Sequence, residues 1–186
     1  MSEPKKKRSK LWILLLILIL APVIVMASWI GTEVMLKKTG NEEFCTSCHT
    51  MKPMAASYAQ TKHAGNNDLG IRASCVDCHL PHDNAAGYLL AKAETGIRDV
   101  WAEFTGNPNE VDWKAKRKHR HEYVFDSGCV KCHAGIAKGA NPNHPSYFAG
   151  GENPFAGEDK FHCVNCHFYV GHSDESKWVK TADAER

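Results

Sequence analysis

The stretch Cys45-Thr46-Ser47-Cys48-His49 organises the whole chain, because its pattern C-x-x-C-H occurs four times in 186 residues. Two thiols at this separation can each add to one vinyl group of a single porphyrin, and the adjoining His can reach the iron as an axial ligand. The pattern therefore predicts covalently attached c-type haem. The other three copies are Cys75-Val76-Asp77-Cys78-His79, Cys129-Val130-Lys131-Cys132-His133 and Cys163-Val164-Asn165-Cys166-His167.

Four haems and no disulfides are expected, since the four motifs use all eight cysteines. Zinc is the rival interpretation, because four Cys pairs can also form two tetrahedral Cys₄ sites. Zinc, however, gives no reason for a His after every second Cys. With 11 His in 186 residues, four such coincidences have a chance on the order of 10⁻⁵.

The composition also points to an interior filled by cofactors. Hydrophobic residues make up 43% of the chain, but 18 of them lie between Leu11 and Ile30. The remainder is roughly 37% hydrophobic, against the usual level of about 45–50%. We therefore predict a mainly α-helical fold with much loop, in which four covalent haems organise a small multihaem cytochrome c domain. The protein without haem should hardly fold.

The spacing of the motifs predicts how this domain is divided. Motif starts are separated by 30, 54 and 34 residues. This pattern indicates two similar two-haem modules, at about 40–82 and 122–174, joined by a connecting helix region.

Residues 11–31 are predicted to form one transmembrane anchor. From Leu11 to Ile30 only Pro22 and Ser28 are not apolar. At about 1.5 Å per residue, this stretch spans the roughly 30 Å of a bilayer core. A cleaved signal peptide is the alternative, but the stretch is longer than the apolar region of about 7–15 residues typical of one.

The ten residues before the anchor are strongly basic. They carry a local charge of +4, whereas the whole chain carries +2. By the positive-inside rule, residues 1–10 form a cytoplasmic tail and residues 32–186 are exported as the haem domain. We expect a single-pass protein of the cytoplasmic (inner) membrane with its haem domain in the periplasm or on the outer face. The overall charge gives no sign of a nucleic-acid partner.

Second axial ligands are expected among the histidines outside the motifs, because a haem that transfers electrons is usually six-coordinate. A surface role is the alternative for each, and it is strongest for His119, His121 and His162, which lie beside basic residues or a motif Cys. Met51 is a further candidate, either as a thioether ligand or as a side chain packed on the porphyrin. The other candidates are His63, His82, His144 and His172.

A helix with one buried stripe is predicted from Tyr88 to Phe104, where apolar residues recur at spacings of three and four. Its stripe comprises Leu90, Ala93, Ile97, Val100, Trp101 and Phe104. Lys92 and Asp99 are seven residues apart and so share a face, while Glu94 and Arg98 should form an ordinary i,i+4 pair.

The first haem should lie near the membrane surface, since Cys45 follows Ile30, the last residue of the apolar stretch, by only 15 residues. Its natural electron donor is therefore lipid-soluble. A Lys that donates a hydrogen bond and a carboxylate that accepts a proton are what quinol oxidation needs, which makes Lys92 and Asp99 candidate catalytic residues. A solvated helix face is the alternative.

The cytoplasmic tail, single anchor and four exported motifs resemble the tetrahaem quinol dehydrogenases of the NapC/NirT family across nearly the whole chain. Three details look most like the membrane subunit of cytochrome c nitrite reductase. They are the sequence from Cys45 to Pro53, Lys92 seven residues before Asp99, and His172 five residues after His167.

The resemblance implies menaquinol as the substrate and a ligand set for each haem. Cys45 and Cys48 would hold the first haem, with Met51 rather than His49 on the iron, Asp99 near its other face and Lys92 lining the quinol site. The resemblance further implies His79 with His172 on the second haem, His133 with His63 on the third, and His167 with a ligand from the partner on the fourth.

The implied function is a menaquinol dehydrogenase that passes electrons to the catalytic subunit of a periplasmic cytochrome c nitrite reductase, for ammonia-forming nitrite respiration. Terminal reduction would occur in that partner. His82 and His144 also resemble extra distal ligands in the branch that feeds periplasmic nitrate reductase, so a subunit for nitrate reductase or another reductase is the alternative. A tethered electron carrier without a quinol site and a zinc-stabilised exported binding protein are the other function classes.

Overall fold

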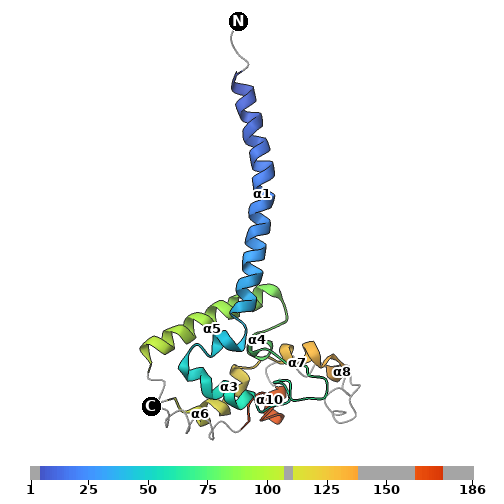
Figure 1. The fold of residues 1–186 in the computed structure, drawn as a ribbon. Coiled ribbons are helices and arrows are strands. Elements are labelled where there is room, and N and C mark those ends of the chain that lie inside the picture. Colours follow the sequence, from blue (N-terminus) through green and yellow to red (C-terminus); the bar gives the residue numbers. More distant parts are fainter. Residues whose placement is uncertain (1–4, 107–110, 138–161, 174–186) are drawn as a thin grey trace. The chain divides into compact units, whose positions relative to one another are not determined.

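The computed structural model describes residues 5–106, 111–137 and 162–173 (Figure 1). The chain divides into two compact units, Met1–Gly40 and Asn41–Arg186. The first unit contains helix α1, Lys5–Lys38, which continues through Pro22. The described part of the chain has one helix that is long and apolar enough to cross a membrane, Lys10–Lys38.

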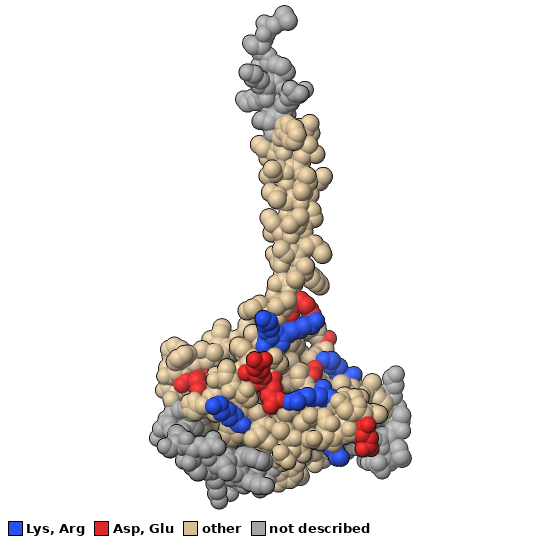
Figure 2. All heavy atoms as spheres, in the orientation of Figure 1, with Lys and Arg blue, Asp and Glu red and all other residues tan. Residues whose placement is uncertain are grey.

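The side chains of α1 are apolar on all sides and exposed from Leu11 through Ile30. Figure 2 shows this surface without acidic or basic groups along most of the described helix. A helix that is hydrophobic all round needs an apolar environment. This fits the predicted membrane anchor, although the helix extends past residue 31 to Lys38.

The second unit is built from short helices. In chain order they are α2 (Glu42–Cys45), η1 (His49–Met51), α3 (Lys52–Tyr58), α4 (Cys75–His79), α5 (Ala85–Thr105), α6 (Trp113–Lys118), η3 (Arg120–Glu122), α7 (Asp126–Cys132), α8 (Ala134–Ala137) and α10 (Cys163–Cys166). The residues described form no strand beyond a single bridge between Ala64 and Arg72. The predicted mainly α-helical fold class is confirmed.

The second, third and fourth motifs each contribute a turn of helix, in α4, α7 and α10. Local capping explains where α4 begins. Asp77 Oδ2 accepts hydrogen bonds from Ser74 N at 2.8 Å and Ser74 Oγ at 2.6 Å, which closes a capping box. Because residues three apart lie on the same face of a helix, such a turn presents both Cys side chains in one direction.

The long helix α5 (Ala85–Thr105) is capped at both ends. Asn84 Oδ1 accepts a hydrogen bond from Gly87 N at 2.7 Å, and Gly106 caps the C-terminus. The predicted helix from Tyr88 to Phe104 is therefore confirmed, with one turn more at its start. The predicted burial of its apolar stripe is wrong, because Leu90, Ile97, Trp101 and the rest of the stripe are exposed.

Very little of the second unit is a protein core. Among the described residues, the buried hydrophobic side chains are Leu80 and Val164, and the buried polar ones are Ser57 and Thr61. An ordinary domain of this size buries far more apolar surface. The packing agrees with an interior that a large apolar cofactor completes.

Candidate haem and quinol sites

The second and third motifs lie side by side although 54 residues separate their starts. Phe125 N donates to the carbonyl of Cys78 at 2.9 Å, and Lys131 Nζ donates to Asp77 Oδ1 at 2.7 Å. Gly128 in α7 is buried against the carbonyl of Asp77, and a Cβ atom at this position would collide with that oxygen. The absence of a side chain at Gly128 thus allows α4 and α7 to approach closely.

Asp126 joins the third motif to the fourth. Its Oδ1 accepts from Cys163 N at 2.9 Å, and its Oδ2 lies 2.8 Å from His162 Nδ1. The thiols of Cys129 and Cys163 lie within 4.8 Å of each other and shift each other's pKa in opposite directions. The thiols of Cys45 and Cys75 influence each other's pKa in the same way, so the first motif adjoins the second as the third adjoins the fourth.

Two pairs of histidine rings lie at similar separations, one tilted and one edge-on. The centroids of His79 and His172 are 6.2 Å apart, and those of His63 and His133 are 6.1 Å apart. Two imidazoles that bind one metal ion through bonds of about 2 Å have centroids roughly 6 Å apart. Each pair therefore has the separation of a bis-histidine iron site.

Hydrogen bonds to Nδ1 orient three of these four rings. His79 Nδ1 lies 2.7 Å from the carbonyl oxygen of Tyr123, and His63 Nδ1 lies 3.0 Å from that of Val170. His172 Nδ1 lies 3.0 Å from the Met54 carbonyl and 2.9 Å from Ser57 Oγ. A carbonyl partner at Nδ1 selects the tautomer that keeps the lone pair on Nε2 for a metal.

The surroundings keep the pair of His79 and His172 neutral. Burial, with a smaller contribution from the neighbouring His79, lowers the pKa of His172 to about 4. The ring of His79 retains accessible surface, but the protein around it desolvates it and lowers its pKa as well. Neutral imidazole is the form that binds a metal ion.

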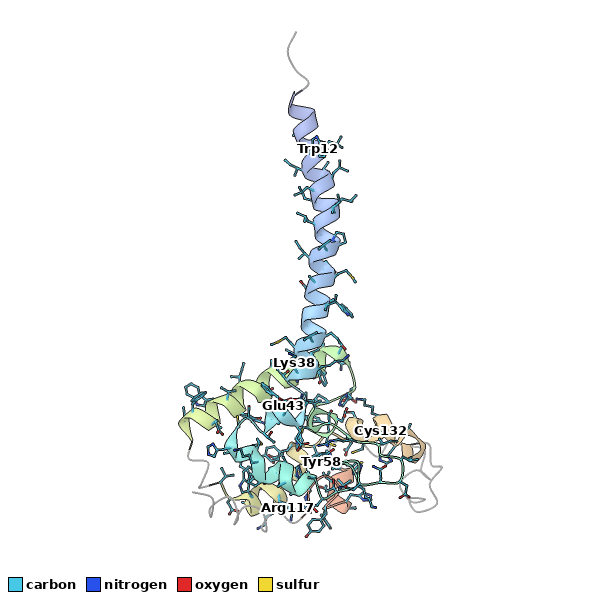
Figure 3. All side chains as sticks on the ribbon, in the orientation of Figure 1. Trp12, Lys38, Glu43, Tyr58, Arg117 and Cys132 are labelled. Carbon is cyan, nitrogen blue, oxygen red and sulfur yellow. The ribbon has the colours of Figure 1, made fainter. Side chains whose placement is uncertain are left out.

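Tyr58, which is labelled in Figure 3, ties the candidate ligand His63 to the rest of the second unit. Its hydroxyl lies 2.6 Å from the carbonyl oxygen of His63 and also contacts the carbonyl of Ala73. Burial raises the pKa of Tyr58 to about 12, so its hydroxyl stays a donor. Its ring meets that of His172 edge-on at 6.4 Å.

Glu103 of α5 holds the first motif, and the sequence reasoning missed it. Its Oε1 lies 2.8 Å from His49 Nδ1, and its Oε2 accepts from Thr50 Oγ1 at 2.8 Å. Glu103 follows Asp99 by four residues and so shares the face that carries Lys92 and Asp99. This shared face was the sequence feature from which Glu103 could have been identified as a candidate site residue. Met51, at the end of η1, is half-buried.

Lys92 and Asp99 both lie close enough to Cys45 to act on its free thiol. The Cys75 thiol lowers the pKa of Cys45 to about 7. Burial and the charge of Asp99 act to raise this pKa, and the charge of Lys92 acts to lower it. Burial in turn lowers the pKa of Lys92. Asp99 is exposed and lies 3.7 Å from Arg98 Nε. The ion pair that the structure shows for Arg98 is thus with Asp99, not with the predicted Glu94.

The other candidate histidines have different surroundings. His82 Nε2 lies 3.1 Å from the carbonyl oxygen of Val76, and its ring packs against Tyr88 at 5.5 Å. His121 stacks on His162 at 5.4 Å, and His119 pairs with Glu122. His167, after α10, is exposed. His144 lies outside the described residues.

The arrangement of the cysteines fits haem better than zinc. All eight lie in the described residues. Within this part of the chain, one group of at least three potential metal ligands gathers, namely Asp126, Cys129 and Cys163. No Cys₄ set forms among these eight cysteines, whereas a structural zinc site needs four ligands. Imidazole pairs at the separation of a bis-histidine site, two cysteines in each motif and a thin core are features that haem would use.

Comparison with known proteins gives the same class. The family model described as "NapC/NirT cytochrome c family, N-terminal region" matches residues 6–177. Cytochrome c-type protein TorC of Escherichia coli K12 is 30% identical in an alignment of 176 residues that covers 90% of this chain and 44% of TorC. The chain therefore spans less than half the length of this relative.

Two further relatives are matched over more of their own length. Cytochrome c-type protein NapC of Paracoccus pantotrophus is 29% identical over 77% of this chain and 63% of NapC. Cytochrome c nitrite reductase subunit NrfH of Nitratidesulfovibrio vulgaris is 31% identical over 74% of this chain and 70% of NrfH. No solved structure matches. With four attachment motifs and a family match over almost its whole length, the chain belongs to the NapC/NirT cytochrome c family of haem-carrying electron-transfer proteins.

Proposed function

We propose that this chain oxidises menaquinol at the outer face of the cytoplasmic membrane and passes the electrons through four c-type haems to a periplasmic cytochrome c nitrite reductase. The observation that carries the proposal is the placement of Lys92 and Asp99. Both come from one face of α5, and the charges of both act on Cys45 of the first motif. A hydrogen-bond donor and a proton acceptor on this face therefore act electrostatically on the first attachment site.

The eight motif cysteines would hold the four haems. The pairs His79 with His172 and His63 with His133 would ligate the second and third, and their separations of 6.2 and 6.1 Å support this assignment. Met51 would ligate the first haem, and His167 the fourth, together with a ligand from the partner. When bound, each haem supplies an acceptor for one electron at a time.

Quinol loses two electrons and two protons, so the protein must hold the ring and remove the protons. Lys92 would donate a hydrogen bond from Nζ to a quinol oxygen. Asp99 would accept a proton at a carboxylate oxygen. Because the Asp99 side chain is 66% exposed, that proton can leave directly to water.

The preference for nitrite reductase rests on His82 and on the relatives. His82 Nε2 is engaged by the Val76 carbonyl instead of facing a motif histidine, which does not favour the nitrate-reductase ligand pattern. NrfH, a cytochrome c nitrite reductase subunit, is among the relatives at 31% identity. A subunit that feeds periplasmic nitrate reductase is the second candidate, since NapC matches at 29%.

The decisive experiment compares two electron donors in purified full-length protein. We expect Lys92→Ala and Asp99→Asn to lose quinol-dependent haem reduction by about 10²- to 10⁴-fold. Dithionite should still reduce all four haems in both variants. Lys118→Ala and Glu94→Gln, which alter an exposed Lys and an exposed acid, serve as matched controls and should behave as wild type.

Near wild-type quinol oxidation in both variants would contradict the proposed site. A colourless preparation would contradict haem altogether. The partner is tested separately by isolating the intact complex from detergent-solubilised membranes, where recovery of a nitrate reductase in place of a nitrite reductase would select the second candidate.

A further inference from the structure

The apolar stripe of α5 is exposed along the whole helix. The exposed fractions range from 44% for Leu89 to 85% for Phe104. At about 100° per residue, these side chains fall on one continuous face. Leu89 extends the predicted stripe of Leu90, Ala93, Ile97, Val100, Trp101 and Phe104 by one residue.

Contacts on the opposite side of α5 fix this orientation. Glu103 accepts hydrogen bonds from His49 and Thr50, and its side chain is only 19% exposed. Lys92 lies on the same inward side, where burial lowers its pKa. The helix therefore cannot rotate its apolar stripe inward without breaking the bonds to the first motif.

A surface of this kind needs an apolar partner. Soluble monomers rarely expose continuous apolar patches larger than a few hundred Å². The stripe combines Trp and Phe with aliphatic side chains and carries no charge, while the charged Glu94 and Arg98 lie beside it. This composition is typical of helices that lie in the plane of a membrane interface.

We propose that the apolar stripe of α5 lies in the interfacial layer of the membrane that α1 is suited to span. The chain itself argues for lipid as the occupant. The second unit begins at Asn41, three residues after the end of α1 at Lys38. A unit tethered this closely cannot leave the membrane surface, so lipid is always within reach of an exposed apolar face.

This contact has a consequence that rests on the proposed function. Lys92 and Asp99 lie on the side of α5 away from the stripe, so quinol would enter sideways from the leaflet rather than through water. The stripe would hold that entrance at the depth of the lipid headgroups.

Photocrosslinking of full-length holoprotein in lipid nanodiscs tests the contact. A benzophenone analogue of phenylalanine is placed at Phe104, at Trp101 and, as a control, at Leu69, which is 80% exposed but lies outside α5. We expect lipid adducts, identified by their mass, at 101 and 104 in at least ten-fold higher yield than at 69. Equal yields, no adduct, or adducts to another protein or a second copy would overturn the proposal.

A second measurement compares two quinols. Trp101→Gln with Phe104→Gln should slow oxidation of a long-tailed quinol embedded in the nanodisc by about ten-fold or more, while a water-soluble quinol analogue is oxidised at the wild-type rate. Equal slowing with both quinols would overturn the lipid contact. Adducts without any quinol oxidation in wild type would reject the proposed function alone, and quinol oxidation without adducts would reject the lipid contact alone.

Discussion

His49 and Glu103 form a direct link between the first motif and α5, with Nδ1 of the imidazole 2.8 Å from Oε1 of the carboxylate. The second carboxylate oxygen accepts from Thr50. This link engages the motif histidine at Nδ1 and fixes its ring, while Met51, two residues on, is the iron ligand that the family resemblance implies. Glu103 is thus a candidate positioning residue for the first haem.

Glu103→Gln should weaken this link, because a neutral amide replaces the charge that holds His49. We expect His49 to compete with Met51 for the iron. Because Met ligation raises the reduction potential of a haem, the potential of the first haem should fall, and a redox titration followed by visible absorbance measures it. Glu94→Gln on the same helix is the control, and an unchanged potential in Glu103→Gln would refute the prediction.

His63→Ala and His172→Ala should each convert one low-spin haem to a high-spin form, since each removes one strong-field ligand. Electron paramagnetic resonance of the oxidised protein counts the low-spin haems. His121→Ala, which removes an exposed ring stacked on His162, should leave the spectrum unchanged. Spectra identical to wild type in either of the first two variants would exclude that histidine as a ligand.

Gly128→Ala should destabilise the holoprotein by about 1–3 kcal/mol, as overpacking typically does, because the added methyl collides with the carbonyl of Asp77. Thermal unfolding gives the shift. Gly135→Ala is the matched control, since a Cβ at Gly135 meets no other atom within 4 Å. If both variants unfold at the same temperature, the close approach of α4 and α7 is not what stabilises this region.

Tyr58→Phe should cost about 1–2 kcal/mol, because the carbonyls of His63 and Ala73 lose a shared donor. The Phe ring can still pack edge-on against His172 and beneath Arg72, which lies 5.7 Å from the Tyr58 centroid. Haem content should therefore stay constant while the unfolding temperature falls. Loss of a haem from the purified variant would show that Tyr58 does more than brace the His63 segment.

The rate of quinol oxidation should fall as the pH rises, and this fall should be centred below pH 10.5, the ordinary pKa of lysine. Burial lowers the pKa of Lys92, and the opposing charge of Cys45 disappears once that sulfur is joined to haem. Only the protonated amine donates a full set of hydrogen bonds, so the activity falls as pH rises through the lowered pKa. Lys92→Arg stays protonated and should shift this alkaline limb upward. An identical limb in both proteins would assign the titration to another group.

The sequence alone was sufficient for features that depend on neighbouring residues. The attachment motifs, the membrane-length helix and the existence of α5 all follow from short-range chemistry. Apolar residues at spacings of three and four predicted α5 from Tyr88 to Phe104, and the structure adds the turn that Asn84 caps. The ligand pairs His79 with His172 and His63 with His133 were instead implied by the family resemblance, and they stay predictions that the ring separations support.

Only the tertiary structure revealed the bond from His49 to Glu103 and the outward direction of the α5 stripe. Helical periodicity shows which residues share a face, but not which medium that face meets. The prediction of a buried stripe assumed that apolar faces turn toward a protein core. Here the polar face with Lys92 and Glu103 turns inward because the first motif supplies its partners, and those contacts are made between residues more than fifty positions apart.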